Sequence, residues 1–275
     1  MTRSTLPSMQ WLVACIAAAV GCATFDPEAG PPAVPEIRPG ILAGYLPPDA
    51  LPNSLEFVPP PPAAGSTATA LDEELNTRTF ALQGTPRWRL AHEDANLMFP
   101  RAAGTFSCAL DAPITEVETP RLYMLLRRTL ADAGLSTYAV KNRYGRARPF
   151  MANKKTTCTP DEEEYLRKDG SYPSGHAAIG WAWALILSEI APERSDAILA
   201  RGRAFGQSRM VCNVHWQSDV VEGQLVGSAA VARLHADPAF RADLKAATSE
   251  VAEVRSRSLE PTRDCRAEAE ALAGE

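Results

Sequence analysis

The sequence has no excess of positive charge. Its 28 lysines and arginines are outnumbered by 33 aspartates and glutamates, which gives a formal net charge of -5 at pH 7. A protein that binds nucleic acid mainly through the phosphate backbone needs a basic surface. The charge balance therefore argues against nucleic acid as the main partner, and it makes any local cluster of basic residues more informative.

Long apolar runs are missing beyond the N-terminus. After residue 23, no uninterrupted apolar stretch approaches the roughly 18 residues of a membrane-spanning helix. The stretch WLVACIAAAVGCA follows an early charge at Arg3 and has the length of the hydrophobic region of a signal peptide. We interpret residues 1–22 as an export signal that is not part of the fold.

The end of this segment contains a candidate lipidation site. The tetrapeptide AVGC, ending at Cys22, resembles the lipobox of bacterial lipoproteins, in which the cysteine is lipidated and becomes the new N-terminus. Ala19 stands where leucine is more usual, so cleavage after Ala23 is the alternative. We expect a periplasmic or cell-envelope protein, attached to the outer membrane through a lipid on Cys22 or else soluble and secreted.

Zinc-ligand spacing is absent among the cysteines that follow, which are Cys108, Cys158, Cys212 and Cys265. An even number of cysteines in an exported chain predicts one or two disulfides. Four cysteines allow three full pairings, and the sequence does not choose among them. We favour Cys108 with Cys158, because both lie in loop-like stretches, FSCALD and TTCTP.

Alternating strand patterns and internal repeats are absent, whereas helix signals recur. Residues 23–70 are rich in proline and predict a linker or wrapping arm. Thr-Pro pairs at 85–86 and 119–120 are typical of helix starts, and the apolar run 177–190 is typical of a central helix. The sequence predicts an all-α domain over residues 71–250, followed by a tail, 251–275, that forms a surface helix or frays.

The first cluster of candidate functional residues is KNRYGRARP. Lys141 and Arg148 are separated by about two helical turns, so a continuous helix would place both on one face. Pro149 disfavours helical geometry at Arg148 and predicts a helix exit there. The compact ammonium group of a lysine and the planar guanidinium group of an arginine together suit the oxygens of a phosphoryl group.

The second cluster, GSYPSGH, directly precedes the apolar helix. Small residues at a helix start let backbone N–H groups converge on an anion, and the helix N-terminus adds favourable electrostatics. Ser174 adds a hydroxyl, Gly175 permits close approach of its amide, and His176 supplies a titratable proton.

The third cluster is SRMVCNVHWQSD. His215 and Asp219 stand at positions i and i+4, so the carboxylate can accept a hydrogen bond from one imidazole nitrogen. The other nitrogen then stays free and basic, as an oriented nucleophile or base requires. Arg209 precedes His215 by about two turns on the helical count.

Each cluster alone has an ordinary structural explanation: a solvated basic face, a capped helix start, and a structural His–Asp pair. Together, Lys-x6-Arg-Pro, Pro-Ser-Gly-His and Ser-Arg-x5-His-x3-Asp resemble the three-part signature of the type 2 phosphatidic acid phosphatase and haloperoxidase superfamily. Within it, GSYPSGH and the flanking TPRLYMLL, RARPF, TCTPDEE and HWQSDV resemble the bacterial class A non-specific acid phosphatases over roughly residues 72–240. Ala177 and Asn213 depart from the more usual Thr and Gly, and neither change removes a catalytic group.

The resemblance implies an all-α fold and a role for each cluster. His215 would attack phosphorus to give a phosphohistidine, Asp219 would orient its ring, and His176 would protonate the leaving alcohol and later help to activate water. The groups that would hold the phosphoryl oxygens are Lys141, Arg148, Ser174, Gly175 and Arg209. The resemblance also implies a broad range of phosphate monoesters as substrates, no metal or other cofactor, and a homodimer.

Three alternatives share these motifs. A membrane lipid phosphatase needs several spanning helices, which this sequence lacks after its N-terminus. A vanadium haloperoxidase would bind vanadate at His215, but such proteins are generally longer. An inactive, anion-binding lipoprotein would not require an oriented nucleophile, so the intact His215, Asp219 and His176 favour the phosphatase.

Overall fold

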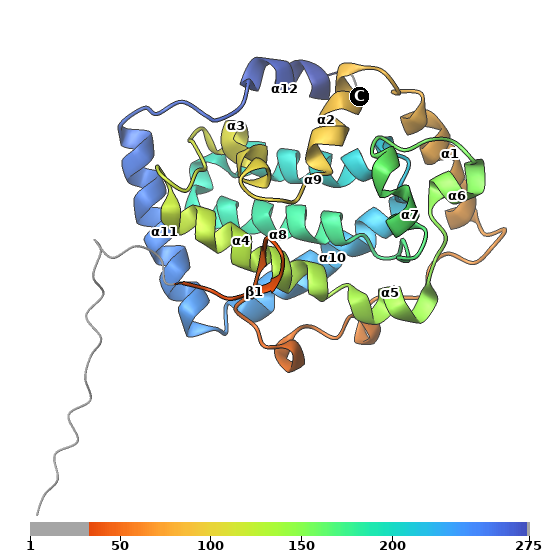
Figure 1. The fold of residues 1–275 in the computed structure, drawn as a ribbon, viewed down its shortest axis with the longest axis horizontal. Coiled ribbons are helices and arrows are strands. Elements are labelled where there is room, and N and C mark those ends of the chain that lie inside the picture. The colour runs from red at the N-terminus through yellow and green to blue at the C-terminus, as the bar shows by residue number, and fades with distance from the viewer. Residues whose placement is uncertain (1–32, 274–275) are drawn as a thin grey trace, which may run out of the picture. The chain divides into compact units, whose positions relative to one another are not determined.

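The structure is a computed structural model that describes residues 33–273, so the predicted export signal and Cys22 lie outside the described residues. Helices dominate this part of the chain, which confirms the predicted all-α class (Figure 1). None of the described helices is both long and apolar enough to cross a membrane.

Four long helices form the centre of the fold: α4 (Pro120–Leu135), α8 (Gly175–Ile190), α9 (Ser195–Val211) and α10 (Gln217–Leu234). The apolar helix α8 is buried on most faces because it packs against the other three (Figure 1). On α10, a Cβ at Gly223 would lie 2.4 Å from the carbonyl oxygen of Ser174, the N-cap of α8, and a Cβ at Gly227 would lie 2.4 Å from that of Ala178 in α8. The two glycines therefore let α10 pack directly on the backbone of α8 and bring its first turn to the start of α8.

Other helices surround this centre. They are α1 (Thr67–Phe80), α2 (Pro86–Asp94), α3 (Ser107–Leu110), α5 (Tyr138–Tyr144), α6 (Pro149–Asn153), α7 (Glu163–Leu166), α11 (Pro238–Ser256) and α12 (Cys265–Leu272). The described 3-10 helices are η1 (Pro48–Ala50), η2 (Ser54–Glu56), η3 (Arg101–Phe106), η4 (Pro160–Glu162) and η5 (Pro192–Arg194). Thr85 caps α2 by accepting a hydrogen bond from the Trp88 N–H, as its Thr-Pro signal predicts.

The described part of the proline-rich segment, from residue 33 on, includes two strands that the sequence analysis did not predict. β1 (Glu36–Arg38) and β2 (Ile41–Leu42) form an antiparallel hairpin. Just after it, the Asp132 carboxylate of α4 accepts hydrogen bonds from the N–H groups of Tyr45 and Leu46, both at 2.9 Å. This part of the segment is therefore an arm packed on the helices, and its strand pairing was too short to leave an alternating pattern.

The C-terminal segment is also part of the folded unit. The predicted domain boundary at residue 250 falls inside α11, which continues to Ser256. Beyond it, α12 is attached to the rest of the domain through a disulfide between Cys265 and Cys108.

The predicted pairing of Cys108 with Cys158 is wrong. Cys158 is instead joined to Cys212, which stands at the C-terminal end of α9. The Cα atoms of the two pairs are 5.4 Å apart for Cys108–Cys265 and 4.7 Å apart for Cys158–Cys212. Loop character indicates exposure to oxidation but carries no information on which loops the fold brings together.

Candidate active site

The three predicted clusters meet at one cleft of about 1120 Å³. Six of the eight predicted site residues line it: Lys141, Arg148, Gly175, His176, Arg209 and His215. The other two, Ser174 and Asp219, are fully buried next to the cleft residues and support them. The segments that supply these residues are far apart in the sequence, and the packing of α8, α9 and α10 brings them together.

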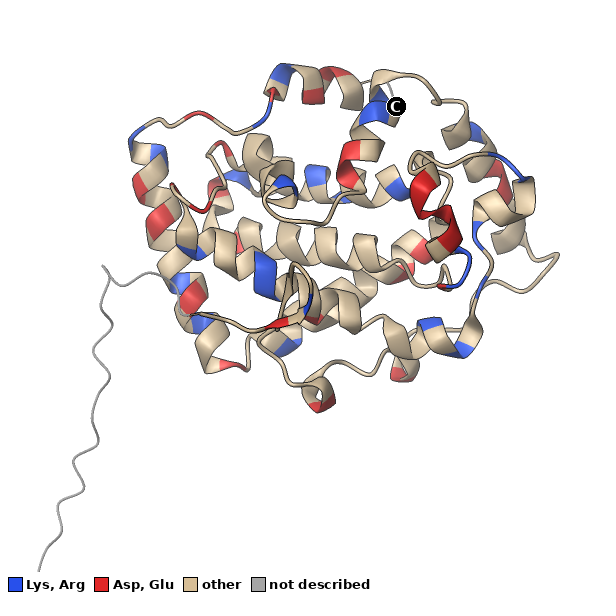
Figure 2. Cartoon of the chain, viewed as in Figure 1, with Lys and Arg blue, Asp and Glu red and all other residues tan. Residues whose placement is uncertain are grey.

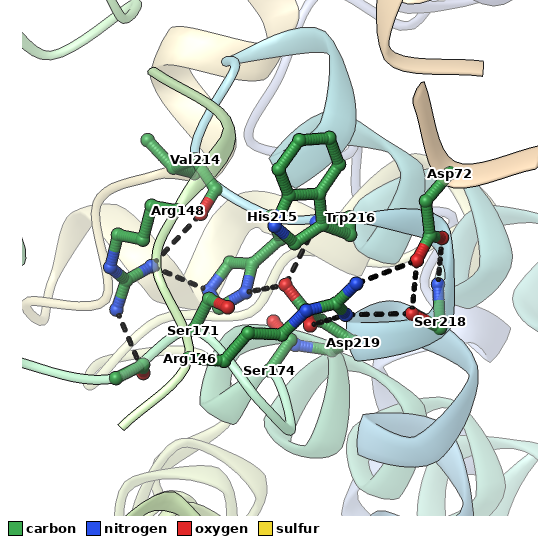
Figure 3. Close-up of polar contacts among 12 residues, drawn as sticks. Asp72, Arg146, Arg148, Ser171, Ser174, Val214, His215, Trp216, Ser218 and Asp219 are labelled. Atoms are coloured by element: carbon green, nitrogen blue, oxygen red, sulfur yellow. Dashed lines mark hydrogen bonds and ion pairs between the residues drawn. The ribbon is translucent and has the colours of Figure 1, made fainter. Parts of the chain in front are cut away.

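His215 has a defined tautomer (Figure 3). Its Nε2 lies 3.0 Å from Nη1 of Arg148, and its Nδ1 lies 3.3 Å from Oδ2 of Asp219. Because a guanidinium group only donates hydrogen bonds, Nε2 is the acceptor and carries a lone pair. Nδ1 then carries the proton and donates it to Asp219, so the basic nitrogen of the ring faces the cations of the cleft.

The environment of His215 keeps its ring neutral. Burial holds the pKa of His215 well below its usual range, and the positive charges of Arg148 and Lys141 lower it further. A neutral ring retains the Nε2 lone pair in mildly acidic solution, where a free histidine would be protonated.

Asp219 has two structural roles at the start of α10. It is the third residue of the helix, and its Oδ2 accepts a 2.8 Å hydrogen bond from the Trp216 N–H, which caps the helix. Its Oδ1 accepts a 2.6 Å hydrogen bond from Arg146. Burial raises the pKa of Asp219, and Arg146 and the Trp216 N–H act in the opposite direction.

The start of α8 has the predicted cap. The Ser174 hydroxyl accepts a hydrogen bond from the Ala177 N–H, and the Ser174 N–H donates to the backbone oxygen of Asp219 at 2.9 Å. Helices α8 and α10 are thereby linked at their N-terminal ends. A Cβ at Gly175 would meet Thr137 only at 3.7 Å, so no packing within the chain requires glycine there.

His176 is held by α2. Its Nε2 lies 2.9 Å from the backbone oxygen of Ala95, which follows α2. Because a carbonyl oxygen only accepts, Nε2 carries a proton, and Nδ1 is the nitrogen left for proton exchange. Burial and then the charge of Arg209 hold the pKa of His176 well below its usual range.

The three cleft cations that the motifs predicted differ in how well they are paired. Lys141 donates to the backbone oxygen of Gly170 at 2.6 Å and lies 3.5 Å from Asp169, and burial lowers its pKa to about 8. Arg148 donates to Asp169 Oδ2 at 2.9 Å. Arg209 is 1% exposed, and within the described part of the chain its Nε and Nη1 have no hydrogen-bond partner. Burial lowers the pKa of Arg209 to about 10, with Glu162 acting against this shift.

The helix geometry predicted for Lys141 and Arg148 is wrong, although the two residues do meet. Helix α5 ends at Tyr144, Gly145 adopts a left-handed conformation with φ of 51°, and Arg148 lies in an extended segment that begins α6. Pro149 therefore marks a helix entry. The two side chains come together because both bind the Asp169–Gly170 turn.

The backbone conformation at Asn213 explains why the family more usually has glycine at this position. It has a φ of 63°, a left-handed conformation that asparagine tolerates better than most residues. Its side-chain oxygen accepts hydrogen bonds from Asn76 and Asn153, and its Nδ2 donates to the backbone of Lys155 and Thr156. Asn213 therefore anchors the turn that precedes His215 to α1 and α6.

Several residues of the site had no clear sequence signal. Arg146 lies between Lys141 and Arg148, but no spacing rule distinguishes it from the other basic residues there. Asp72 lies in an ordinary acidic stretch of α1, and it joins the site only through tertiary contacts. Asp161 and Glu162 of η4 also line the cleft, next to the acidic helix α7 (Figure 2).

Residues 33–273 contain no group of three or more His, Cys, Asp or Glu side chains placed to hold a metal ion. The expectation that the reaction needs no cofactor stays a prediction.

Comparisons with known proteins identify the family of the chain. A family model described as the PAP2 superfamily matches residues 122–242. The chain is 45% identical over 204 residues to a non-specific acid phosphatase of Providencia stuartii, covering 74% of this chain and 82% of that protein. A non-specific acid phosphatase of Salmonella typhimurium is 43% identical over 193 residues, covering 70% and 77%. An acid phosphatase of Zymomonas mobilis is 39% identical over 209 residues, covering 76% and 79%.

Proposed function

This chain belongs to the PAP2 superfamily and, within it, to the bacterial class A acid phosphatases, and we propose that it hydrolyses phosphate monoesters through a phosphohistidine formed on His215. The observation that carries the proposal is the hydrogen bonding of His215. Asp219 accepts a hydrogen bond from Nδ1–H, and Arg148 donates one to Nε2, so the lone pair of Nε2 lies at the cleft.

The first step is an in-line attack of Nε2 on phosphorus. The N–P bond forms as the bond from phosphorus to the ester oxygen breaks, and the departing oxygen takes a proton from Nδ1 of His176. The proton on Nδ1 of His215 stays between the ring and Asp219, which stabilises the positive charge that develops on the imidazole. In the second step, Nδ1 of neutral His176 takes a proton from water, and the water oxygen attacks phosphorus as the N–P bond breaks, which releases phosphate and returns the lone pair to Nε2 of His215.

The positive charges of the cleft stabilise the transition state. Lys141, Arg148 and Arg209 supply cations, and the first turn of α8 supplies backbone donors and the Ser174 hydroxyl. These groups take the role that metal ions have in many other phosphoryl-transfer enzymes, which supports a metal-independent reaction. The two unpaired nitrogens of Arg209 provide donors for phosphoryl oxygens without the loss of an existing contact.

Substrate binding favours the protonated form of His176, which the first step requires. In the free site its ring is neutral, because burial and Arg209 oppose protonation. A bound phosphoryl group offsets the cations and so raises the pKa of His176. The monoanion of a phosphate monoester, whose second pKa is about 6, also brings a proton with it. This reasoning favours activity on the acidic side of neutrality.

The cleft beyond the phosphoryl site supports a broad substrate range. Its volume exceeds what a phosphoryl group needs, and its outer lining mixes apolar side chains such as Leu97 and Ile179 with charged ones such as Arg38 and Glu162. Such a surface accepts leaving alcohols of different chemistry, because the lining does not require one particular set of hydrogen-bonding groups on the alcohol.

We further propose export to the periplasm or cell envelope through residues 1–22. The two disulfides support an oxidising compartment. Lipidation of Cys22, and with it attachment to the outer membrane, is the finer proposal, with a soluble secreted form as the alternative. The family resemblance extends the proposal to a homodimer.

The test is phosphate release from a chromogenic aryl phosphate between acidic and neutral pH, with and without EDTA. We expect wild-type activity to survive EDTA and His215→Ala to abolish turnover. His235→Ala is the matched control, because His235 is partly exposed and pairs with Glu189 away from the cleft. Quenching with alkaline denaturant during turnover should trap a base-stable, acid-labile phosphoenzyme only when His215 is present. Near-normal turnover by His215→Ala would exclude the mechanism.

A further inference from the structure

A chain of polar contacts continues from Asp219 away from the cleft (Figure 3). While one oxygen of Asp219 faces His215, the other accepts a 2.6 Å hydrogen bond from Nη1 of Arg146. Arg146 is 13% exposed and Asp219 is fully buried. The carboxylate that orients the ring therefore has its own cationic partner, distinct from the cations that line the cleft.

Arg146 is itself fixed by Asp72. Its Nη2 donates to Asp72 Oδ2 at 2.8 Å, and its Nη1 lies 2.7 Å from the Ser218 hydroxyl. Ser218 is bound to the same carboxylate, through its N–H at 2.8 Å and its hydroxyl at 2.6 Å. Asp72 lies on α1, so a helix that contributes no residue to the cleft lining is linked to the ring of His215 by three successive contacts.

We propose that Arg146, anchored by Asp72, is a positioning residue that keeps Asp219 in the charge state and orientation needed to hold the Nδ1–H tautomer of His215. The consequence for catalysis rests on the proposed role of His215 as the nucleophile. The structural part of the inference, the control of the tautomer, does not depend on turnover.

The chemical reason is that the two forms of Asp219 select opposite tautomers. An ionised carboxylate only accepts, so Nδ1 must carry the proton and Nε2 keeps its lone pair. A protonated carboxyl group donates to Nδ1, which moves the ring proton to Nε2 and removes the lone pair from the attacking atom. Burial already raises the pKa of Asp219, and loss of Arg146 removes the nearest opposing charge.

Other groups near Asp219 do not replace Arg146. The charged or titratable groups that face it or its partners are Asp72 on α1, Lys141 on α5, Arg148 before α6, Tyr172 before α8, His215 before α10 and Glu222 on α10. The Ser171 hydroxyl and the Trp216 N–H bind the carboxylate but carry no charge. Lys141 and Arg148 are both paired with Asp169, so their charge is shared with another carboxylate.

The experiment compares Arg146→Gln, Arg146→Lys and Asp72→Asn with the wild-type protein. Arg128→Gln is the matched control, because Arg128 is 15% exposed, pairs with Asp243 and does not line the cleft. The readouts are the pH profile of kcat/KM for an aryl phosphate and the tautomer of His215 from the ¹⁵N shifts of labelled histidine. Only four histidines are present, and His215→Ala assigns the signal. Thermal unfolding checks that each variant is folded.

For Arg146→Gln we expect kcat/KM to fall by roughly 10- to 100-fold, the range seen when an outer hydrogen-bonding partner of an active-site ligand is lost. The acidic limb of its profile should move to higher pH, and Nε2-protonated His215 should appear at mildly acidic pH. Arg146→Lys should restore the acidic limb in part, Asp72→Asn should shift it in the same direction by less, and Arg128→Gln should leave it unchanged.

The proposal is overturned if Arg146→Gln keeps the wild-type tautomer and acidic limb, even if its stability falls. If Arg146→Gln does not fold, Arg146→Lys and Asp72→Asn decide in its place, and unchanged tautomers in both overturn the proposal. Absence of turnover in the wild-type protein would remove the proposed function, but a tautomer that changes with Arg146 would still support the positioning role.

Discussion

Two arginines of helix α9 are buried to a similar degree, but only one of them is paired with carboxylates. Arg201 is 2% exposed and Arg209 is 1% exposed. Arg201 binds both oxygens of Asp94, at 3.1 and 2.5 Å, and its Nε lies 3.3 Å from Glu268. Arg209 has two nitrogens without a hydrogen-bond partner in the described part of the chain. The same residue type on one helix therefore serves a structural network in one case and an open site in the other.

The difference is visible in the direction of the pKa shifts. Burial acts to lower the pKa of both side chains, but Asp94 and Glu268 outweigh it and raise the pKa of Arg201. No comparable carboxylate pair reaches Arg209, and its pKa falls to about 10. A buried cation without an ion-pair partner is an unfavourable arrangement for folding, and it is favourable for binding a dianion.

The Arg201 network also supports the active-site cleft. Asp94 is the last residue of α2, and the next residue, Ala95, holds His176 through its backbone oxygen. Glu268 lies on α12, which is tethered by the Cys108–Cys265 disulfide. The paired network thus fixes α2 and, through Ala95, the orientation of His176 in the cleft.

The largest effect on folding is expected from Arg201→Met. This change leaves Asp94 and Glu268 buried with less positive charge, and loss of one partner of a buried ion pair costs about 3–5 kcal/mol. We expect the free energy of unfolding, measured by urea titration, to fall by that amount. A loss below about 1 kcal/mol would show that the network is not the structural element described above.

The largest effect on activity without a loss of stability is expected from Arg209→Met. Removal of one transition-state donor costs about 10²- to 10³-fold in rate at comparable sites. Removal of an unpaired buried charge should leave the free energy of unfolding equal or higher. Steady-state kinetics with an aryl phosphate and urea unfolding on the same sample test both halves. A stability loss as large as that of Arg201→Met would contradict the distinction between the two arginines.

A smaller, pH-dependent effect is expected from Lys141. Its pKa is lowered to about 8, so the charged form is lost as the pH rises through that value. Above pH 8 we expect kcat/KM, which reports on the free enzyme, to fall by up to about tenfold per pH unit. Lys141→Arg keeps its charge and should move this alkaline limb to higher pH, whereas His235→Ala should not.

The stability effect of Lys141 has the opposite sign. Between pH 8 and about 10.4 the unfolded state binds more protons at this side chain than the folded state does, so stability rises with pH. Activity and the contribution of Lys141 to stability should therefore change in opposite directions above pH 8. Parallel losses of both would indicate general unfolding at alkaline pH.

The sequence by itself determined the helices and the chemical groups. Thr85 and Ser174 cap helices as local patterns predict, because a cap depends on residues within one turn. The contact of His215 with Asp219 is also local, since four residues separate them. The family motifs contained Lys141, Arg148 and Arg209, because the chemistry of phosphoryl binding fixes which residue types must be present.

Only the tertiary structure decided which of these groups meet and which charges stay unpaired. The disulfides, the link from Asp72 through Arg146 to Asp219, and the contrast between Arg201 and Arg209 all join segments that are far apart in the sequence. Local patterns carry no information on such contacts, because they depend on how the helices pack. The reactivity of a charged side chain depends on burial and on its neighbours in space, and only the packed fold provides both.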